Sequence, residues 1–541
     1  MKKVVKLSAV LLSLIILLTV MGGCRGEKTE ATDPQGGQDT KISSETKAKE
    51  KITLSILRQR YQHEVAMEQM DIIKLLEEKT NIQIKWDNPP QESFQERYNI
   101  VMVSGDLPDV IMGMPAGDLL KYAQMGVIVP LNDILAQKAP SLTEWMKKRP
   151  EIRKAMTSLD GKIYYFPMFD EEPLGNYPLA IREDWLNKLN LKVPVTTEEW
   201  YQVWKEFKTK DPNGNGKSDE IPFSASYLSW YRMFSAAWGV VDDFYVNPRD
   251  GGKASYGKID DRYREAIAWM ARMYSEGLVD KEIATNDAKA FTGKVAQDLV
   301  GSFRGPMGSN LLAFANNMPE QIPGFKVVGT EPLKGPYGDQ VHPRVDQSPR
   351  GGVIAAVITS ENKYPEETVE WIDYFYSKEG AKLVTHGIEG KTYVITDGNM
   401  RPTEFITKNP DGLSSKEAFG TVSFGQGQGP FVFLKGEGEP DVSNPITALE
   451  LDTKARCIAP FLEESKKFLI PGALSFESAD DSTRRQIMAD IQTYVDEMTT
   501  KFIIGQEPME NWDKYVEKVK GMGIDKVIEI YQKALDIWNK F

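Results

Sequence analysis

Cysteine and histidine are scarce in this chain of 541 residues. Its two cysteines, Cys24 and Cys457, cannot build a disulfide framework. The three histidines, His63, His342 and His386, do not stand in a metal-binding spacing such as H-x-x-x-H, and the chain contains neither a G-x-S-x-G elbow nor a phosphate-binding P-loop. The common signatures of catalysis are therefore missing, and the sequence favours a binding protein over an enzyme.

Positive charge is also in deficit, since 66 lysines and arginines face 78 acidic residues and give a net charge of −12. Binding to nucleic acid requires a basic face that neutralises phosphates, so nucleic acid is excluded as a partner. The acidic pairs Glu171-Glu172 and Asp242-Asp243 do not suggest a glycosidase, because that chemistry needs two carboxyl groups facing one bond. We expect both pairs to be solvated.

The amino terminus has the parts of a secretory signal peptide: a basic segment, residues 1–6, and an apolar run, residues 7–20. The run is shorter than the roughly 20 residues of a membrane-spanning helix. Loss of Lys2, Lys3 and Lys6 with this segment would make the mature protein more acidic still. We expect a signal peptide over residues 1–23.

Small residues directly before Cys24 resemble a bacterial lipobox, although Met21 stands where leucine is more usual. The resemblance implies that Cys24 is acylated and becomes the first mature residue. A diacylglycerol and an amide-linked chain together supply the two signals that stable anchoring needs. The alternative is an ordinary signal peptide followed by a chance cysteine.

Residues 24–50 contain almost no large apolar side chains, which predicts a disordered tether. The composition is globular from residue 51 onward, and about 490 residues are too many for one core, so at least two domains are expected. The spacing of apolar residues predicts strands at residues 52–57, 82–86 and 109–112. It predicts helices between them, at residues 66–76 and 94–102.

This order predicts a parallel sheet covered by helices, and Gly105 is expected to end the second helix. Ligands of such sheets bind beyond the carboxyl ends of the strands. Residues 58–61 and 113–115 follow two of those ends and are therefore candidates for a binding cleft.

Residues 104–111 read SGDLPDVI and resemble the "SGDLPD" turn of bacterial extracellular solute-binding proteins (family 1) that serve carbohydrate ABC importers. Further stretches resemble the same family in the same order, at residues 159–167, 181–186, 387–393 and 512–516. The resemblance thus covers nearly the whole mature chain. It identifies the family and leaves the ligand open.

The resemblance implies a periplasmic-binding-protein-like α/β fold, in which two lobes joined by hinge crossings hold a ligand between them. We place the crossings near residues 175–180, 345–352 and 420–435. The expected N-terminal lobe is 51–177 with 350–425, and the expected C-terminal lobe is 178–349 with 426–541.

A loop at residues 211–220 matches much of the EF-hand calcium pattern. Asp211, Asn213 and Asn215 occupy positions 1, 3 and 5, Gly216 allows the tight turn, and Asp219 stands at position 9. We expect one structural calcium ion, held by Asp211, Asn213, Asn215, the backbone carbonyl of Lys217, Asp219 and Glu220. A metal-free turn is the alternative.

The loop departs from the EF-hand at position 12, where Pro222 replaces the usual glutamate. In this respect it is similar to the calcium loop of alginate-oligosaccharide-binding members of the family, in which an acid pair closes the site. The resemblance therefore assigns that closing role to Asp219 and Glu220.

Sugar sites combine stacking aromatic rings with a few fixed hydrogen-bonding groups. Aromatic density, the family resemblance and the match of guanidinium to carboxylate select eight candidates: Arg58, Arg60, Tyr165, Trp230, Tyr231, Trp238, Phe303 and Arg304. The alternatives are that the aromatic residues belong to a core and that the arginines form surface or interlobe ion pairs.

The sequence thus predicts a monomeric lipoprotein on the extracellular face of the cell membrane. It would capture an oligosaccharide by closing its lobes and deliver it to an ABC permease. A receptor for a peptide or another non-sugar solute is the alternative, and a secreted polysaccharide-degrading enzyme that uses aromatic residues and calcium is a weaker one.

Overall fold

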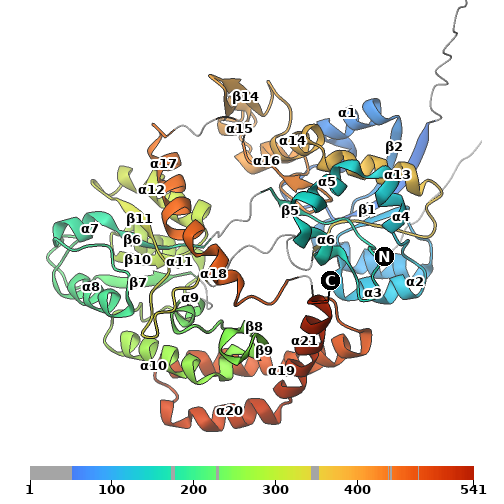
Figure 1. Ribbon diagram of the computed structural model, residues 1–541. Helices are drawn as coiled ribbons and strands as arrows, with labels where there is room; N and C mark the ends of the chain where they lie inside the picture. Colours follow the sequence, from blue (N-terminus) through green and yellow to red (C-terminus); the bar gives the residue numbers. More distant parts are fainter. Residues whose placement is uncertain are drawn as a thin grey trace, which may run out of the picture. The chain divides into compact units, whose positions relative to one another are not determined.

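The computed structural model describes residues 51–171, 177–226, 231–342, 353–436, 438, 442–472 and 474–540 (Figure 1). They belong to the larger of the two compact units into which the chain divides, Glu50–Phe541. The expected signal peptide, the tether, Cys24 and Trp230 lie outside the described residues. No helix in the described ranges has the length and apolar character that a membrane span requires.

The first sheet is the one expected near the amino terminus. Its strands are β1 (Ile52–Arg58), β2 (Ile82–Asp87), β3 (Val110–Met112) and β13 (Val357–Ile358), in the order β13-β3-β1-β2. β1 is parallel to β2 and to β3, with Ile56 opposite Trp86 on one side and Val110 on the other, whereas β13 is antiparallel to β3. The predicted parallel strand order is confirmed.

The two helices between these strands are α1 (Asp71–Thr80) and α2 (Gln91–Ser104). α2 ends as expected, because Gly105 has a φ of 74° and donates its N–H to the carbonyl of Val101. α1 begins later than predicted. The start of the predicted segment instead forms a 3-10 helix, η1 (Met67–Gln69), and the extended backbone of Met70, with a ψ of 138°, separates it from α1.

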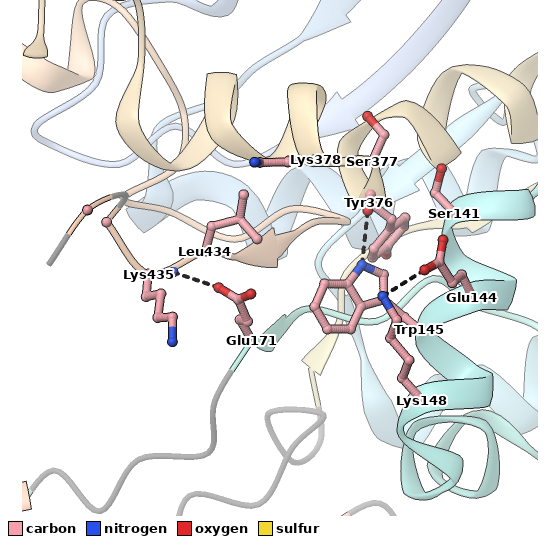
Figure 2. A pocket seen from close by; sticks show the side chains of 12 residues that line it. Ser141, Glu144, Trp145, Lys148, Glu171, Tyr376, Ser377, Lys378, Leu434 and Lys435 are labelled. Atoms are coloured by element: carbon pink, nitrogen blue, oxygen red, sulfur yellow. Dashed lines mark hydrogen bonds and ion pairs between the residues drawn. The ribbon is translucent and has the colours of Figure 1, made fainter. Parts of the chain in front are cut away.

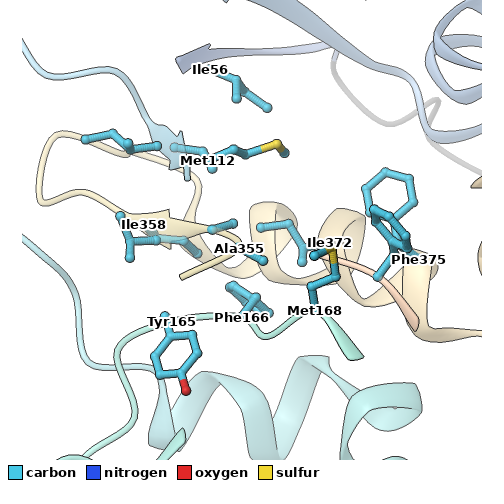
Figure 3. Close-up of a cluster of buried hydrophobic side chains, with 14 of the residues drawn as sticks. Ile56, Met112, Tyr165, Phe166, Met168, Ala355, Ile358, Ile372 and Phe375 are labelled. Atoms are coloured by element: carbon cyan, nitrogen blue, oxygen red, sulfur yellow. The ribbon is translucent and has the colours of Figure 1, made fainter. Parts of the chain in front are cut away.

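A large aliphatic core surrounds the first sheet, and we call it the first core. It contains buried residues of 54–169 and of 354–432. Figure 3 shows Phe166 and Met168 below Ala355, which lies between β12 (Val353–Ile354) and β13. The backbones of Phe166 and Ala356 exchange hydrogen bonds of 2.8 and 3.3 Å, which places this segment against the sheet.

The remaining elements around the first core are helices and short strand pairs. The helices are α3 (Ala116–Gln124), α4 (Asn132–Lys138), α5 (Pro140–Lys148), α6 (Pro150–Met156), α13 (Pro365–Asp373), α14 (Lys378–His386), α15 (Glu404–Thr407) and α16 (Ser415–Gly420). The pairs are β4 (Met114–Pro115) with β12 (Val353–Ile354), β5 (Phe169–Asp170) with β16 (Val432–Phe433), and β14 (Tyr393–Thr396) with β15 (Asn399–Pro402).

The second sheet is mixed. Its strands are β6 (Leu179–Arg182), β7 (Ile221–Ala225), β10 (Val300–Arg304) and β11 (Val327–Thr330), in the order β11-β6-β10-β7. β7 and β10 are parallel, and β6 is antiparallel to both β10 and β11. A hairpin of β8 (Phe244–Asn247) and β9 (Lys253–Tyr256) lies outside this sheet.

The helices that pack around the second sheet follow in two groups. The first is α7 (Glu183–Lys188), α8 (Thr197–Thr209), α9 (Arg232–Ser235), α10 (Asp261–Ser275), α11 (Ala288–Ala296) and α12 (Ala313–Asn317). The second is α17 (Pro445–Asp452), α18 (Leu462–Lys466), α19 (Ser478–Ile503), α20 (Trp512–Gly521) and α21 (Ile524–Trp538). α19 contacts α10 and α21 (Figure 1).

Two hydrophobic clusters lie against the second sheet. The larger, the second core, is rich in aromatic residues and contains buried residues of 179–341 and of 468–527. Trp185, Trp200 and Trp204 are fully buried in it. The smaller, the third core, includes Phe303 and the free thiol of Cys457, which is 1% exposed.

Candidate functional site

A pocket of about 550 Å³ is lined by residues that pack with both large cores, and we call it the shared pocket. The first-core side comprises Ala116, Gly117, Leu119, Leu120, Ala155, Ser158, Tyr165 and Ile354. The other side includes residues 241, 243 and 244, much of residues 469–485, and Tyr531. Its size falls within the range of small-molecule sites.

The pocket lies where the parallel sheet predicts a ligand site. β3 ends at Met112, the short strand β4 follows, and α3 starts at Ala116, which lines the pocket. The lining therefore begins just beyond the carboxyl end of a central strand. Of the two segments selected for this reason, residues 113–115 lead into the pocket, whereas residues 58–61 are not among the described residues that line it.

One wall of the shared pocket is aromatic. The rings of Phe244 and Tyr531 stack with centroids 4.0 Å apart and an interplanar angle of 14°. Phe476 meets Tyr531 edge-on at 5.1 Å, and the guanidinium of Arg484 lies 4.7 Å from the Phe476 ring centroid. Burial raises the pKa of the Tyr531 hydroxyl, so this hydroxyl is neutral at physiological pH. Such a wall offers a flat apolar surface with fixed polar groups beside it.

Charged groups in the shared pocket come mainly from α19. Asp481 accepts hydrogen bonds from Arg484, with Nη2 to Oδ1 at 2.6 Å, and pairs with Arg485, with Nη2 to Oδ2 at 2.9 Å. A Cβ atom at Gly117 would stand 2.5 Å from Nη1 of Arg485. Arg485 thus occupies the space that glycine leaves at the start of α3. Asp243 is a second, exposed carboxylate of the lining.

Tyr165 is the predicted ligand residue that lines the shared pocket. It is 6% exposed, and its hydroxyl donates to the backbone oxygen of Ala155 over 3.0 Å. Burial raises its pKa. The side chain therefore presents a fixed, neutral edge to the pocket.

The arginines predicted at the end of β1 lie elsewhere. Arg58 is 1% exposed, and its two terminal nitrogens donate to the carboxylate of Glu64 at 2.8 and 2.9 Å. The backbone of Arg60 is bonded to that of Pro89 and Gln91, and its side chain is half-buried. The guanidinium of Arg58 is therefore already engaged in a buried ion pair.

The other predicted aromatic residues pack inside the cores. Tyr231 and Trp238 are 3% and 4% exposed in the second core, and Phe303 is 1% exposed in the third. Arg304 is 6% exposed, and its guanidinium lies 5.3 Å from the ring centroid of Tyr177. None of these four residues is among the described residues that line the shared pocket.

The main lining residues that sequence reasoning missed are Asp243, Phe244, Phe476, Arg485 and Tyr531. They come from three distant segments. The expectation that Asp242 and Asp243 are both solvated is wrong for Asp242, which is 4% exposed and lies 3.1 Å from Nε of Arg232. Because Val240, Val241 and Phe244 are buried, the chain turns Asp242 inward with them, and burial raises its pKa to about 7.

A second cavity of about 820 Å³ lies beside the first core (Figure 2). Trp145 of α5 is held in it by a 3.0 Å hydrogen bond from its indole N–H to the carbonyl of Tyr376, and Glu144 pairs with Lys148 at 2.7 Å. Glu171 accepts the backbone N–H of Lys435 at 3.0 Å. Among the described residues, none of the second core lines this cavity, so it is not shared between the two large cores.

The predicted calcium loop has a folded, oxygen-rich geometry. Asp211 accepts the backbone N–H groups of Gly214, Asn215 and Gly216 at 2.8 to 3.1 Å, and Gly214 and Gly216 have φ values of 75° and 76°. The side chain of Asn215 accepts the N–H of Lys217 and donates to Asp219. These contacts turn the oxygen-bearing side chains of the loop toward one another.

Glu220 gives an independent test of whether the loop fits a cation. This residue is fully buried, and neither of its carboxylate oxygens has a hydrogen-bond partner. Burial raises the pKa of this carboxyl, and the nearby Asp211 and Asp219 raise it further. A buried carboxylate without a partner carries a large free-energy cost, which a bound cation would remove. The loop residues therefore fit a divalent ion.

Three or more His, Cys, Asp or Glu side chains do not converge into a ready-made metal site anywhere among the described residues. The ligand set of the loop would thus depend on amide and backbone oxygens in addition to its carboxylates. Asn213 also donates to the backbone oxygen of Asp298 beside β10, and Glu220 directly precedes β7. The loop is in this way tied to two neighbouring strands of the second sheet.

Two α/β sheets with separate cores and a pocket lined from both sides define a periplasmic-binding-protein-like fold. The family model described as "Bacterial extracellular solute-binding protein" matches residues 64–382, more than half of the chain. The chain belongs to this family, as its sequence motifs indicated. Members of the family bind solutes, in agreement with the expectation of binding rather than catalysis.

Three similar proteins are informative. The fructooligosaccharide ABC transporter substrate-binding protein FusA of Streptococcus pneumoniae is 28% identical over 490 residues, which is 86% of each chain. Lipoprotein LipO of Bacillus subtilis is 25% identical, covering 89% of this chain and 92% of its own. The crystal structure of the alginate-binding protein AlgQ2 without calcium ion matches with a TM-score of 0.67 at 26% identity, covering 90% of this chain and 99% of AlgQ2.

Proposed function

We propose that this protein captures an oligosaccharide outside the cell and delivers it to the permease of an ABC importer. The shared pocket carries the proposal, because an aromatic wall and fixed charged groups face residues of the first core across it. The similarity to FusA, which binds fructooligosaccharides, and to the alginate-binding AlgQ2 supports a sugar as the solute.

We propose lobe closure as the mechanism. The first lobe is built on the first core and the second lobe on the second and third cores. Phe431 and Val432 pack in the first core, so we place the last crossing after Leu434, at the late end of the expected range 420–435 and after the lobe boundary expected at residue 425. A ligand that contacts both sides of the shared pocket shifts the population toward the closed form, whose joint surface the permease would recognise.

Calorimetry on the purified mature protein tests the ligand class. Titration with a panel of oligosaccharides and peptides should give binding to sugars alone, and a Phe476→Ala variant should bind them more weakly. Phe405→Ala is the matched control, since Phe405 is also half-buried but packs against the first core away from the shared pocket. Binding of peptides without sugars would replace this proposal with the non-sugar receptor.

Calcium is the second element of the proposal. We infer that Asp211, Asn213, Asn215, Asp219, Glu220 and the carbonyl of Lys217 hold one Ca²⁺. The buried Glu220, whose carboxylate oxygens have no hydrogen-bond partner, supports this inference. The similar AlgQ2 supports it as well, since its crystal structure is described as one without calcium ion. The ion would neutralise the loop carboxylates and fasten the loop to the second sheet, away from the residues that line the shared pocket.

Membrane attachment is the third element. The similarity to Lipoprotein LipO and the lipobox-like sequence support acylation of Cys24. Intact-mass measurement of protein extracted from membranes should show an acylated chain beginning at Cys24. Cys24→Ser should release the protein into the medium or leave its precursor unprocessed, whereas Cys457→Ser should leave both mass shift and attachment unchanged.

A further inference from the structure

The arginines of the shared pocket are already matched by a carboxylate. Asp481 lies between Arg484 and Arg485, at 2.6 Å from one guanidinium and 2.9 Å from the other. The Asp481 side chain is only 11% exposed, so it depends on these two partners for its charge compensation. One carboxylate thus serves both cations.

Neither guanidinium is free to turn away from Asp481 without loss. Arg484 packs against the rings of Phe476 and Tyr531, at 4.7 and 5.7 Å from their centroids. Arg485 fills the space above Gly117 at the start of α3. Packing and charge therefore both hold Arg484, whereas Arg485, whose side chain is 56% exposed, is held mainly by its ion pair with Asp481.

The other acidic residue of the lining, Asp243, adds negative charge to the pocket. Asp243 is exposed on the pocket, and its side chain accepts the backbone N–H of the next residue, Phe244, at 2.8 Å. Among the described lining residues, two carboxylates thus face two arginines, and both arginines are engaged. The pocket has no surplus positive charge to offer an anion.

We propose that the shared pocket is selective for uncharged oligosaccharides and discriminates against sugars that carry carboxylates, such as uronates. This inference rests on the proposed function. A uronate would have to draw an arginine away from the nearly buried Asp481 and would lie near the carboxylate of Asp243, which forms no ion pair within 4 Å among the described residues. A neutral sugar avoids both costs, since its hydroxyls can donate to Asp243 and accept from Arg485 while the ion pairs persist.

The test compares two sets of ligands of equal chain length by calorimetry, at low and moderate ionic strength. The neutral set contains fructo-, xylo- and malto-oligosaccharides, and the acidic set contains oligogalacturonates and alginate oligosaccharides. We expect the best neutral ligand to bind at least about tenfold more tightly than any acidic one. An acidic ligand that binds equally well or better would overturn the selectivity while leaving the sugar receptor intact. Absence of binding by both sets would refute the proposed function, and the selectivity with it.

Charge-removing variants test the residues themselves. Asp481→Asn frees two guanidinium groups and should raise the affinity for trigalacturonate by about tenfold or more, with little change for the best neutral ligand. Asp243→Asn alters an exposed side chain, so it tests the same idea without the risk of unfolding, and should improve acidic binding by a smaller factor.

Glu497→Gln is the matched control. Glu497 lies on the same helix and pairs with Lys501 at 2.5 Å, but it is not among the residues of the shared pocket. This variant should leave both affinities unchanged. If neither Asp481→Asn nor Asp243→Asn changes the ratio of neutral to acidic affinity in a folded protein, the inference is wrong.

Discussion

The first and second cores are built on sheets of similar size but differ in how many charged side chains they bury and in whether these have partners. The first core is largely aliphatic, and its buried arginine, Arg58, is matched by the equally buried Glu64. The second sheet region buries Arg182, Glu220, Asp242, Lys258 and Asp280, and at least Glu220 has no partner. Apolar packing alone can hold the first core, whereas the second depends on conditions that keep its charges balanced. Cations should therefore act mainly on the second region, whereas pH also reaches the first, where burial raises the pKa of the Asp373 carboxyl.

Truncation in the first core should give the largest effect on stability. Phe166 is fully buried between the sheet and neighbouring helices, so Phe166→Ala should lower the free energy of unfolding by about 3–5 kcal/mol. Denaturant unfolding measures this loss. The increment of stability that calcium gives should be the same in this variant as in the parent, and a changed increment would show that the two regions are not independent.

Calcium removal should give the next largest effect, and it should act through the second sheet. At a free ion concentration of a hundred times Kd, binding stabilises the folded state by about 2.7 kcal/mol, so chelation should lower Tm by several degrees. Glu220→Gln should abolish the calcium-dependent part of Tm. Glu198→Gln, an exposed change on the preceding helix α8, should retain it. Equal calcium responses in both variants would contradict the assigned site.

Loss of the aromatic wall should weaken ligand binding without affecting either core strongly. Phe476 is half-buried and stacks near Tyr531 and Arg484, so Phe476→Ala should reduce sugar affinity by about tenfold, equivalent to about 1.4 kcal/mol. Calorimetric Kd values measure the change. A larger loss in Phe405→Ala would move the binding site to the first core.

The pH dependence should be the most gradual effect, since it accumulates over several pH units, and it should belong to Asp242. Its pKa is raised from 3.8 to about 7 in the folded protein, mainly by burial, with Arg232 and Lys258 opposing the rise and Asp243 and Asp496 adding to it. The folded state therefore binds this proton more tightly than the unfolded state does. Stability from this group is fully present below about pH 4 and decreases as the pH rises toward 7, by at most about 1.4 kcal/mol per pH unit.

Asp242→Asn should remove this slope, which thermal melts from pH 4 to 8 would reveal. The exposed neighbour provides a control, because Asp243→Asn should leave the slope in place. An unchanged slope in Asp242→Asn would assign the pH dependence to another group.

Local patterns predicted the first sheet well, and they also account for the folded geometry of residues 211–220, for which calcium binding stays a proposal. The strands around Ile56 and Val110 follow from alternation of apolar residues, and the end of α2 follows from a single glycine. The spacing of the oxygen-bearing residues in the loop carries its geometry, because the contacts made within the loop join near neighbours in the chain. Such features require no knowledge of tertiary packing.

The shared pocket could not be predicted in the same way. Phe244, Phe476 and Tyr531 are separated by more than 50 residues from one another and meet only because α19, α21 and the β8–β9 hairpin pack together. The density of aromatic residues pointed instead to Tyr231 and Trp238, which are buried in the second core. The proline-glycine pair Pro471-Gly472, a few residues before the long helix α19, was the local sequence sign of this part of the pocket lining.

The seclusion of Cys457 makes the protein a convenient subject for distance measurements. Its thiol is 1% exposed, and burial raises its pKa to about 11, so the thiolate that maleimide dyes attack is nearly absent at neutral pH. A soluble form that starts after Cys24 would carry no other cysteine. One engineered cysteine on each lobe would then accept donor and acceptor fluorophores selectively, and opening and closing could be followed on single molecules without altering the native thiol.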